Sequence, residues 1–315
     1  MANLYLTHKC NRGCPFCFAR KVLKESGKIN ETLSLKEIEN LINHYDGQFK
    51  NFGLLGGEPF LYPELVEVIK LLKSRGITST VFTSATNPMP EGLAQLDPIE
   101  CKLAFVVNVG LRDTYNDRQF QNLEAFFNTF HQAASLSYTI FDLSTSPTFL
   151  FDLIDKYNLS RIIRTGIALP IYKGGNQYIP IDDYKKAGDY FIKCADEAAS
   201  RGIIMNMDCG FIACMFSTSQ IGHLIKLGGH VGFVCGAAID IGPELKAWNC
   251  FPLFQLGKVN AMDYNTMEDL NCALIHKVDE TLGESCGVLP ECGSCDLKKR
   301  KRCDGGCRSF SSIDI

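Results

Sequence analysis

Three cysteines near the start of the chain have a spacing that suits metal chemistry. Cys10, Cys14 and Cys17 lie in "CNRGCPFC", separated by three and by two residues. A structural zinc site closes with four ligands, and no nearby Cys completes a set of four, which leaves His8 as a weak alternative. Three thiolates suit a [4Fe–4S] cluster whose fourth iron has no protein ligand. Such an open iron could bind a small molecule and pass it an electron.

A second group of cysteines lies in the last third of the chain. Its densest part is "CGSCDLKKRKRCDGGC" (292–307), with the spacing C-x2-C-x7-C-x3-C, which is typical of a metal site. Spacing alone does not distinguish an iron–sulfur cluster from zinc. Cys101, Cys194 and Cys272 belong to neither group, and we expect them to be small buried hydrophobic residues. The group contains Cys209, Cys214, Cys235, Cys250, Cys286, Cys292, Cys295, Cys303 and Cys307.

The composition places the chain among ordinary globular proteins. Its 315 residues are 46% hydrophobic and 21% charged, with a net charge of -3, which predicts neither nucleic acid nor a membrane as partner. The N-terminus lacks a signal peptide, and no run approaches the roughly 20 apolar residues of a membrane helix. We therefore predict a cytoplasmic protein. Because thiols persist in a reducing compartment, the fifteen cysteines indicate metal binding more than disulfides.

Alternating strands and helices are predicted for the first two-thirds of the chain. Hydrophobic patterns and glycine stops define about six strand–helix units, which is an α/β pattern with parallel strands. An eight-unit barrel typically needs about 250 residues, so we predict a partial, open (β/α)6 barrel over residues 1–205. The strands are expected at 2–7, 52–57, 78–84, 102–110, 136–142 and 161–169, and the helices at 33–45, 62–76, 115–131, 148–157 and 181–202.

From about residue 205 the regular periodicity fades and Gly-rich turns become frequent. We therefore expect residues 206–315 to form a small Cys-rich domain with little regular structure. Metal would have to stabilise such a segment, because it offers too little secondary structure to pack a core.

The segment "LLGGEP" (54–59) follows the second predicted strand. Gly56 and Gly57 would allow close backbone approach to a ligand, and Glu58 supplies an anionic acceptor for a cationic amine. By itself the segment could be an ordinary strand-to-helix turn. It lies, however, one strand after the three-cysteine loop, and both loops belong to the end of the sheet where β/α barrels place their active sites.

Together the two segments resemble the radical S-adenosylmethionine (SAM) superfamily. "CNRGCPFC" is similar to its C-x3-C-x-φ-C signature, with Phe16 in the aromatic position, and "GGEP" is similar to its amine-binding motif. The resemblance implies an oxidoreductase-type enzyme with a [4Fe–4S] cluster whose open iron binds SAM. It also implies reductive cleavage of SAM to a 5′-deoxyadenosyl radical, which abstracts hydrogen from the substrate.

Weaker similarities suggest further SAM contacts. By resemblance, Ser84 would lie near the ribose, Arg118 would contact the SAM carboxylate, and Leu169 would contact adenine. Asn108 stands in the fourth-strand segment, where this sequence departs from the usual pattern. For each of these residues a packing or surface role is an equally good interpretation.

The later cysteines resemble the SPASM extension of radical SAM peptide maturases, which implies one or two auxiliary [4Fe–4S] clusters, with structural zinc as the alternative. By resemblance, the first cluster would use Cys235, Cys250 and Cys307, with Cys209 or Cys214 as fourth ligand. Cys292, Cys295 and Cys303 would hold the second. The usual last cysteine downstream is absent, so either Cys286 supplies the fourth ligand or that cluster keeps an open iron.

The resemblance favours modification of a peptide or protein side chain, giving a thioether, another crosslink or an oxidation in a ribosomally made peptide. Because the cysteine loop begins at residue 10, we expect no N-terminal leader-binding domain, and recognition would use a separate protein or the barrel. An electron donor such as flavodoxin or ferredoxin is implied. One alternative is a radical SAM enzyme for a small molecule. The other is a non-enzymatic iron–sulfur or zinc protein, which would not need an amine-binding loop.

Overall fold

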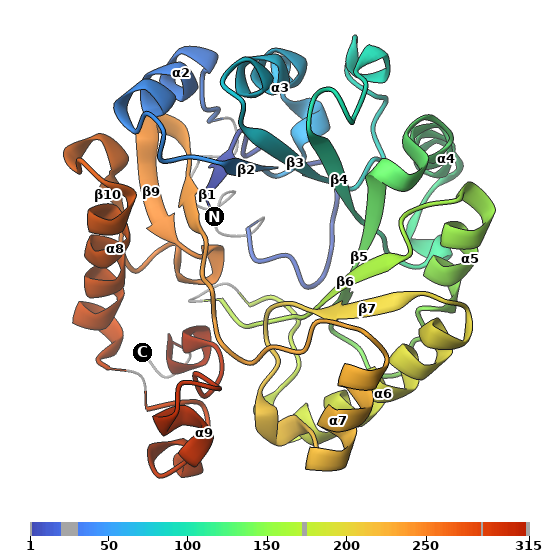
Figure 1. Ribbon diagram of the computed structural model, residues 1–315, viewed down its shortest axis with the longest axis vertical. Coiled ribbons are helices and arrows are strands. Elements are labelled where there is room, and N and C mark those ends of the chain that lie inside the picture. The colour runs from blue at the N-terminus through green and yellow to red at the C-terminus, as the bar shows by residue number, and fades with distance from the viewer. Residues whose placement is uncertain (1, 20–30, 172–174, 285, 313–315) are drawn as a thin grey trace.

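A curved β-sheet organises the molecule (Figure 1). The computed structural model describes residues 2–19, 31–171, 175–284 and 286–312. Within these residues ten strands form one sheet, in the order β10-β9-β8-β1-β2-β3-β4-β5-β6-β7. The strands are β1 (Ala2–Tyr5), β2 (Asn51–Leu55), β3 (Thr78–Thr83), β4 (Leu103–Asn108), β5 (Ala134–Ile140), β6 (Ile162–Ile167), β7 (Ile204–Met207), β8 (Ile239–Ile241), β9 (Lys246–Asn249) and β10 (Val259–Asn260).

The neighbouring strands from β8 through β1 to β7 are all parallel, whereas β9 and β10 run antiparallel to their neighbours. Parallel strands end at the same edge of a sheet, so the loops that follow β1 to β7 meet at one edge. The register places Tyr5 at the end of β1 opposite Leu55 at the end of β2. The cysteine loop and the "GGEP" loop therefore begin side by side.

Helices cover the outer face of this sheet (Figure 1). Local capping explains where several of them begin: the side chain of Ser34 accepts the N–H of Glu37 before α2, and Asn116 accepts that of Gln119 before α4. The helices are α2 (Leu35–His44), α3 (Leu65–Ser74), α4 (Asp117–Phe130), α5 (Thr148–Tyr157), α6 (Tyr184–Ser200), α7 (Thr218–Lys226), α8 (Met267–Leu282) and α9 (Asp296–Lys299).

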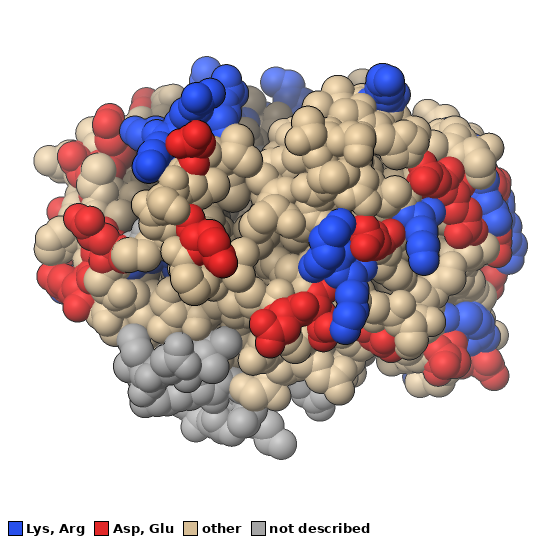
Figure 2. Space-filling view, turned by 90° about the horizontal axis from the view of Figure 1, so that it is seen from below, with Lys and Arg blue, Asp and Glu red and all other residues tan. Residues whose placement is uncertain are grey.

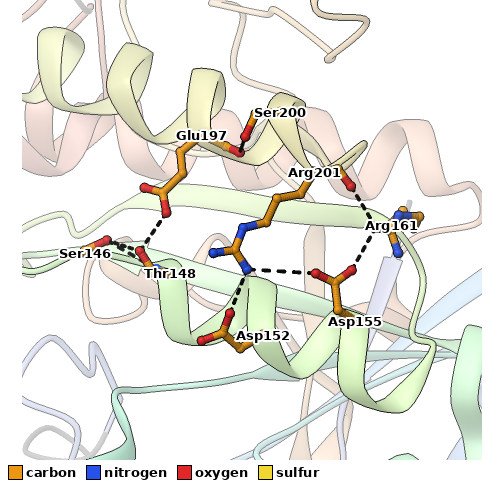
Figure 3. Close-up of polar contacts among 8 residues, drawn as sticks. All are labelled: Ser146, Thr148, Asp152, Asp155, Arg161, Glu197, Ser200 and Arg201. Carbon is orange, nitrogen blue, oxygen red and sulfur yellow. Dashed lines mark hydrogen bonds and ion pairs between the residues drawn. The ribbon is translucent and has the colours of Figure 1, made fainter.

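The main core lies between the sheet and these helices, with side chains such as Leu54, Phe105 and Phe126 fully buried. Outside it, ion pairs join neighbouring helices. Arg201, just after α6, places Nη1 2.6 Å from Asp152 Oδ1 of α5 (Figure 3). Thr148 of α5 donates to Glu197 of α6 at 2.8 Å. An exposed ion pair contributes little stability, but these two contacts join α5 to α6 on the outer side of the barrel.

The six predicted strands and five predicted helices are confirmed, and their boundaries agree within a few residues, but only the short helix η2 (Leu93–Gln95) lies between β3 and β4. The expectation that regular structure fades after residue 205 is wrong, because strands β8 to β10 and helices α7 to α9 follow. Strands β8 to β10 have three, four and two residues, which is too short for a periodic pattern. Helix α8 buries only Leu270, Leu274 and Val278, a stripe too narrow to be prominent in the sequence.

Two observations bear on possible partners. No helix among the described residues is both long and apolar enough to span a membrane. On the face shown in Figure 2, basic and acidic side chains are dispersed among uncharged residues.

Candidate active site and cysteine groups

The three-cysteine loop follows β1 and turns back on itself. The N–H of Cys17 donates to the carbonyl of Cys14 at 3.1 Å. Backbone N–H groups also point at two of the sulfurs: that of Arg12 lies 3.4 Å from Cys10 Sγ, and that of Ala19 lies 3.4 Å from Cys17 Sγ. Hydrogen bonds to sulfur are one way in which proteins tune iron–sulfur clusters.

The thiol of Cys10 lies in a crowded, electronegative environment. Its pKa is raised to about 11, mainly by burial, while the N–H of Arg12 lowers it. The nearby charges of Glu58 and of the other two thiols raise it further. These charges show that the three thiols lie near one another and near the "GGEP" carboxylate. A thiol binds a metal as the thiolate, so metal binding here would release protons.

The two glycines of "GGEP" lie directly against the cysteine loop. The N–H of Gly57 donates to the carbonyl of Thr7 at 2.7 Å, and that of Glu58 donates to the carbonyl of Lys9 at 2.8 Å. A Cβ on Gly57 would lie 2.4 Å from Lys9 O, and one on Gly56 would lie 2.7 Å from Thr7 O. The close approach that we predicted for a ligand is therefore made by the cysteine loop itself.

The carboxylate of Glu58 is buried and accepts four hydrogen bonds. Oε1 accepts from Thr83 Oγ1 at 2.5 Å and from Phe60 N at 3.1 Å. Oε2 accepts from Ser84 Oγ at 2.5 Å and from Ser84 N at 2.9 Å. A carboxylate has about four acceptor positions, so an added amine would have to displace a donor. The Ser84 hydroxyl could move, because it also lies 2.9 Å from Thr86 Oγ1.

The loops after β3 and β4 reach the cysteine loop through residues that the sequence does not predict. Asn11 and Asn87 pair through their side-chain amides, at 2.8 and 3.2 Å. The Arg12 guanidinium lies 4.4 Å from the centroid of the Tyr115 ring, and the Tyr115 hydroxyl accepts the N–H of Gly110 at 2.6 Å. No motif marks Asn87 or Tyr115, because their role depends on which loops meet.

The ends of β5 and β6 complete the contacts around the cysteine loop. The Phe16 ring lies 4.9 Å from that of Phe141, just after β5. The Asn176 side chain donates to the carbonyls of Leu169 and Phe16, at 2.9 and 3.3 Å, and the N–H of Gln177 donates to that of Pro15 at 3.0 Å. The loops after β2 to β6 therefore all touch the cysteine loop.

The remaining residues predicted to contact SAM differ in how deeply they are buried. Leu169 is buried beyond the end of β6. Asn108, at the end of β4, and Arg118, in the first turn of α4, are exposed. The structure thus brings Phe16, Leu169, Ser84 and Glu58 to one edge of the sheet, with Arg118 on the helix outside it.

The first group of later cysteines meets near the end of β9. Cys250 precedes the short helix η8 (Phe251–Leu253), which contacts η11 (Arg308–Ser312) just after Cys307. The N–H of Cys235 donates to Asp304 Oδ2 at 2.6 Å, in the same loop as Cys307. Cys209 follows β7.

Electrostatics relates these four thiols to one another. Burial raises the pKa of Cys250, and the charges of Cys307, Cys209 and Cys235 raise it further. Desolvation by the surrounding protein, followed by Asp208, raises the pKa of Cys209, with smaller contributions from Cys235 and Cys307. The four thiols form one neighbourhood.

The second group surrounds a glycine turn. Cys292 and Cys303 are buried, and the N–H of Cys295 donates to the carbonyl of Cys292 at 3.3 Å. The N–H of Gly305 points at Cys303 Sγ at 3.4 Å. A Cβ on Gly287 would lie 2.3 Å from Cys292 Cβ, so the segment that follows Cys286 packs tightly against this group.

The donor sets of all three cysteine groups consist of thiols, which suit iron–sulfur clusters and zinc alike. In the described part of the chain, no three His, Cys, Asp or Glu side chains come together to hold a single metal ion. A cluster has a different requirement, because each thiolate binds its own iron atom. The groups offer thiols, which are soft ligands, and backbone N–H groups point at several of the sulfurs. A cavity of about 450 Å³ near Ala2 and Asn51 lies at the other end of the sheet, and none of the predicted site residues lines it.

Comparison with known proteins gives one family match. Residues 4–136 match the radical SAM superfamily, and this range contains both motifs. A SAM-dependent nucleotide dehydratase of Flammeovirga pacifica is 26% identical over 136 residues, which is 38% of this chain and 46% of that protein. A GTP 3′,8-cyclase of Microcystis aeruginosa is 28% identical over 93 residues, which is 29% of this chain and 28% of that protein. The chain thus spans less than half the length of these curated relatives.

The chain therefore carries a radical SAM domain, and the predicted resemblance to radical SAM enzymes is confirmed. This family implies a [4Fe–4S] cluster and SAM. Among solved structures, SuiB of Streptococcus suis superimposes with a TM-score of 0.68 at 16% identity, covering 97% of this chain and 72% of SuiB. SuiB bound to its precursor peptide SuiA gives a TM-score of 0.67 at 14% identity. At such identities the likeness shows a shared fold, which extends through the Cys-rich C-terminal region.

Proposed function

We propose that this chain is a radical SAM enzyme that modifies a side chain of a ribosomally made peptide or protein. The observation that carries the proposal is the convergence of the loops after β2 to β6 on the three-cysteine loop, with Glu58 beside it. When bound, the cluster supplies the electron that cleaves SAM to methionine and a 5′-deoxyadenosyl radical. The protein then has to hold SAM, position the substrate and exclude water.

Each residue of the site has a proposed task. Cys10, Cys14 and Cys17 hold the cluster and leave one iron for SAM. Glu58 accepts the SAM amine as Ser84 shifts its hydroxyl to Thr86. The remaining contacts would come from three places: the edge of the sheet (Phe16, Asn108 and Leu169), the backbone beside the cysteine loop (Gly56 and Gly57), and helix α4 (Arg118).

The peptide substrate is supported by the extent of the shared fold. The likeness to SuiB covers 97% of this chain, and SuiB has been solved with a precursor peptide bound. The product would be a thioether, another crosslink or an oxidation. A leader-binding protein and an electron donor of the flavodoxin or ferredoxin type would be partners. Small-molecule chemistry is the second candidate, because the curated relatives include a nucleotide dehydratase and a GTP cyclase.

The C-terminal cysteines would hold auxiliary clusters. We assign the barrel to residues 1–205 and the SPASM-like region to 206–315. Cys209, Cys235, Cys250 and Cys307 supply the four thiols of a first auxiliary cluster, in line with their shared neighbourhood. These clusters would accept an electron from the product radical, bind the substrate or stabilise the region, and structural zinc is the competing occupant.

The proposal is tested by anaerobic reconstitution followed by reduction with SAM. We expect 5′-deoxyadenosine from the parent protein and none from Cys14→Ala. Adding candidate precursor peptides, and separately nucleotides, should raise the yield with one class only, and mass spectrometry should locate the change. Absence of SAM cleavage with every substrate class would refute the proposal, and zinc in place of iron in the C-terminal region would refute the auxiliary clusters.

A further inference from the structure

The second cysteine group contains three thiols in its own loop, and its fourth protein ligand is not evident from the spacing. Cys307, the next cysteine along the chain, lies with the first group. Cys286 is one candidate because its neighbour Gly287 packs on Cys292. Cys214 is another, although it lies far upstream, just after the barrel.

The glycine turn of the second group lies against the segment that carries Cys214. A Cβ on Gly306 would lie 3.3 Å from Ile212 Cγ2, two residues before Cys214. A Cβ on the preceding Gly305 would lie 3.3 Å from Cys292 Sγ. These two adjacent glycines therefore separate Cys292 from the Cys214 segment by little more than the thickness of the backbone.

Helix α6 holds the Cys214 segment in place. Cys214 is the middle residue of the short helix η6 (Ala213–Met215), and Ile212 and Met215 are each 1% exposed, whereas Cys214 is exposed. A Cβ on Gly188 of α6 would lie 2.5 Å from Met215 O, so η6 packs directly on α6. The buried residues on either side anchor Cys214, which is itself exposed.

The charges around each thiol separate the cysteines into two sets. Desolvation raises the pKa of Cys214, and the nearby charges that raise it further are those of Cys292, Cys303 and Cys295. The corresponding cysteine neighbours of Cys209 are Cys235 and Cys307. Cys214 and Cys209 are thus near different groups, although only four residues separate them.

We propose that Cys214 is the fourth protein ligand of the second auxiliary cluster, together with Cys292, Cys295 and Cys303. This inference rests on the proposed auxiliary clusters. Both clusters would then have four thiolates, and neither would have an open iron for a substrate. The second cluster would also connect the end of β7 to the C-terminal loop, which makes it a crosslink between the barrel and the Cys-rich region.

The test begins from a chain in which Cys10, Cys14 and Cys17 are replaced by Ala. After anaerobic reconstitution, two auxiliary clusters would give about eight iron atoms per chain. Adding Cys214→Ala should leave one iron without a thiolate, lower the count to about seven and produce a [3Fe–4S] signal in the electron paramagnetic resonance spectrum of the oxidised protein. The matched control Cys286→Ala should change neither the count nor the spectrum.

A second background separates a lost ligand from general unfolding. Replacing Cys292, Cys295 and Cys303 by Ala should remove the second cluster and leave about four iron atoms. Adding Cys214→Ala to this background should cost no further iron, whereas adding Cys209→Ala should. Further loss of iron with Cys214→Ala in this second background would assign Cys214 to the first cluster and overturn the proposal. An unchanged iron count and an unchanged electron paramagnetic resonance spectrum for Cys214→Ala in the first background would also overturn it. No iron in the starting chain would refute the auxiliary clusters themselves, whereas SAM cleavage by the parent protein is assayed independently.

Discussion

Gly57 offers a direct test of how the two motif loops pack. An alanine Cβ at this position would lie 2.4 Å from Lys9 O and 2.7 Å from Cys10 Cβ. Optimal non-bonded contacts between carbon atoms are about 3.5–4.0 Å, so the contact with Cys10 Cβ is about 1 Å too short, and the contact with Lys9 O is shorter still. The neighbours belong to the cysteine loop, and the loop itself would have to move.

The expected cost of Gly57→Ala follows from this overlap. Overpacking a tight site typically costs about 1–3 kcal/mol. The matched control is Gly222→Ala in α7, where a Cβ would meet nothing within 4 Å. There, the alanine should stabilise the helix by about 0.5–1 kcal/mol. The two variants should therefore differ by roughly 1.5–4 kcal/mol in free energy of unfolding.

Urea unfolding of the reduced, metal-free protein measures this difference, and iron analysis after anaerobic reconstitution measures its effect on the site. We expect Gly57→Ala to unfold at a lower urea concentration than the parent protein and to bind less iron. Gly222→Ala should match or exceed the parent protein in unfolding midpoint and in iron content. If Gly57→Ala kept the parental unfolding midpoint and iron content, the close packing of the two loops would be refuted.

Three further predictions concern single side chains. Burial raises the pKa of Asp240 to about 7, so the folded state binds the proton more tightly than the unfolded state. The free energy of unfolding should therefore fall by up to about 4 kcal/mol as pH rises from 4 through 7. Urea unfolding across this range measures the fall, and Asp240→Asn should remove this dependence of stability on pH. Phe251 is buried and stacks on Tyr5 at 5.1 Å, so Phe251→Ala should cost about 3–5 kcal/mol, and Phe251→Leu much less by the same assay. Glu58→Gln should weaken SAM binding roughly tenfold or more in calorimetry, since a hydrogen bond to a charged group contributes about 1.5–3 kcal/mol. Ser84→Ala should retain SAM binding. Equal losses of affinity in the two variants would argue against the proposed amine site.

Much of the barrel was predictable because its signals are local. Alternating hydrophobic patterns and glycine stops marked six strands and five helices of the barrel, as in α5, where the predicted range 148–157 is the observed one. The neighbourhood of the two motifs was also predictable, since consecutive parallel strands end at one edge of the sheet. The bond from Gly57 N to Thr7 O confirms that neighbourhood.

Other parts of the site depend on contacts that leave no local pattern. Strand β8 has three residues and pairs with β1, so that Asp240 lies beside Asn3 at the far end of the sequence. Asn87 and Tyr115 meet the cysteine loop only because the loops after β3 and β4 fold over it. A single polar or aromatic residue in a loop is too common in sequences to predict such a contact.

The later cysteines show why spacing is a weak guide to shared ligands. Four residues separate Cys209 from Cys214, yet the cysteine charges that raise the pKa of each thiol come from different groups. The chain turns sharply between them at Gly210, with a φ of +96°, where a Cβ would lie 2.8 Å from Ile167 Cβ. This turn lies on the end of β6, so the barrel determines the direction in which each thiol is presented. If the proposed clusters form, their ligand sets are therefore determined by how the strands and loops of the barrel end, and ligation would connect the Cys-rich region to the edge of the sheet that carries the proposed active site.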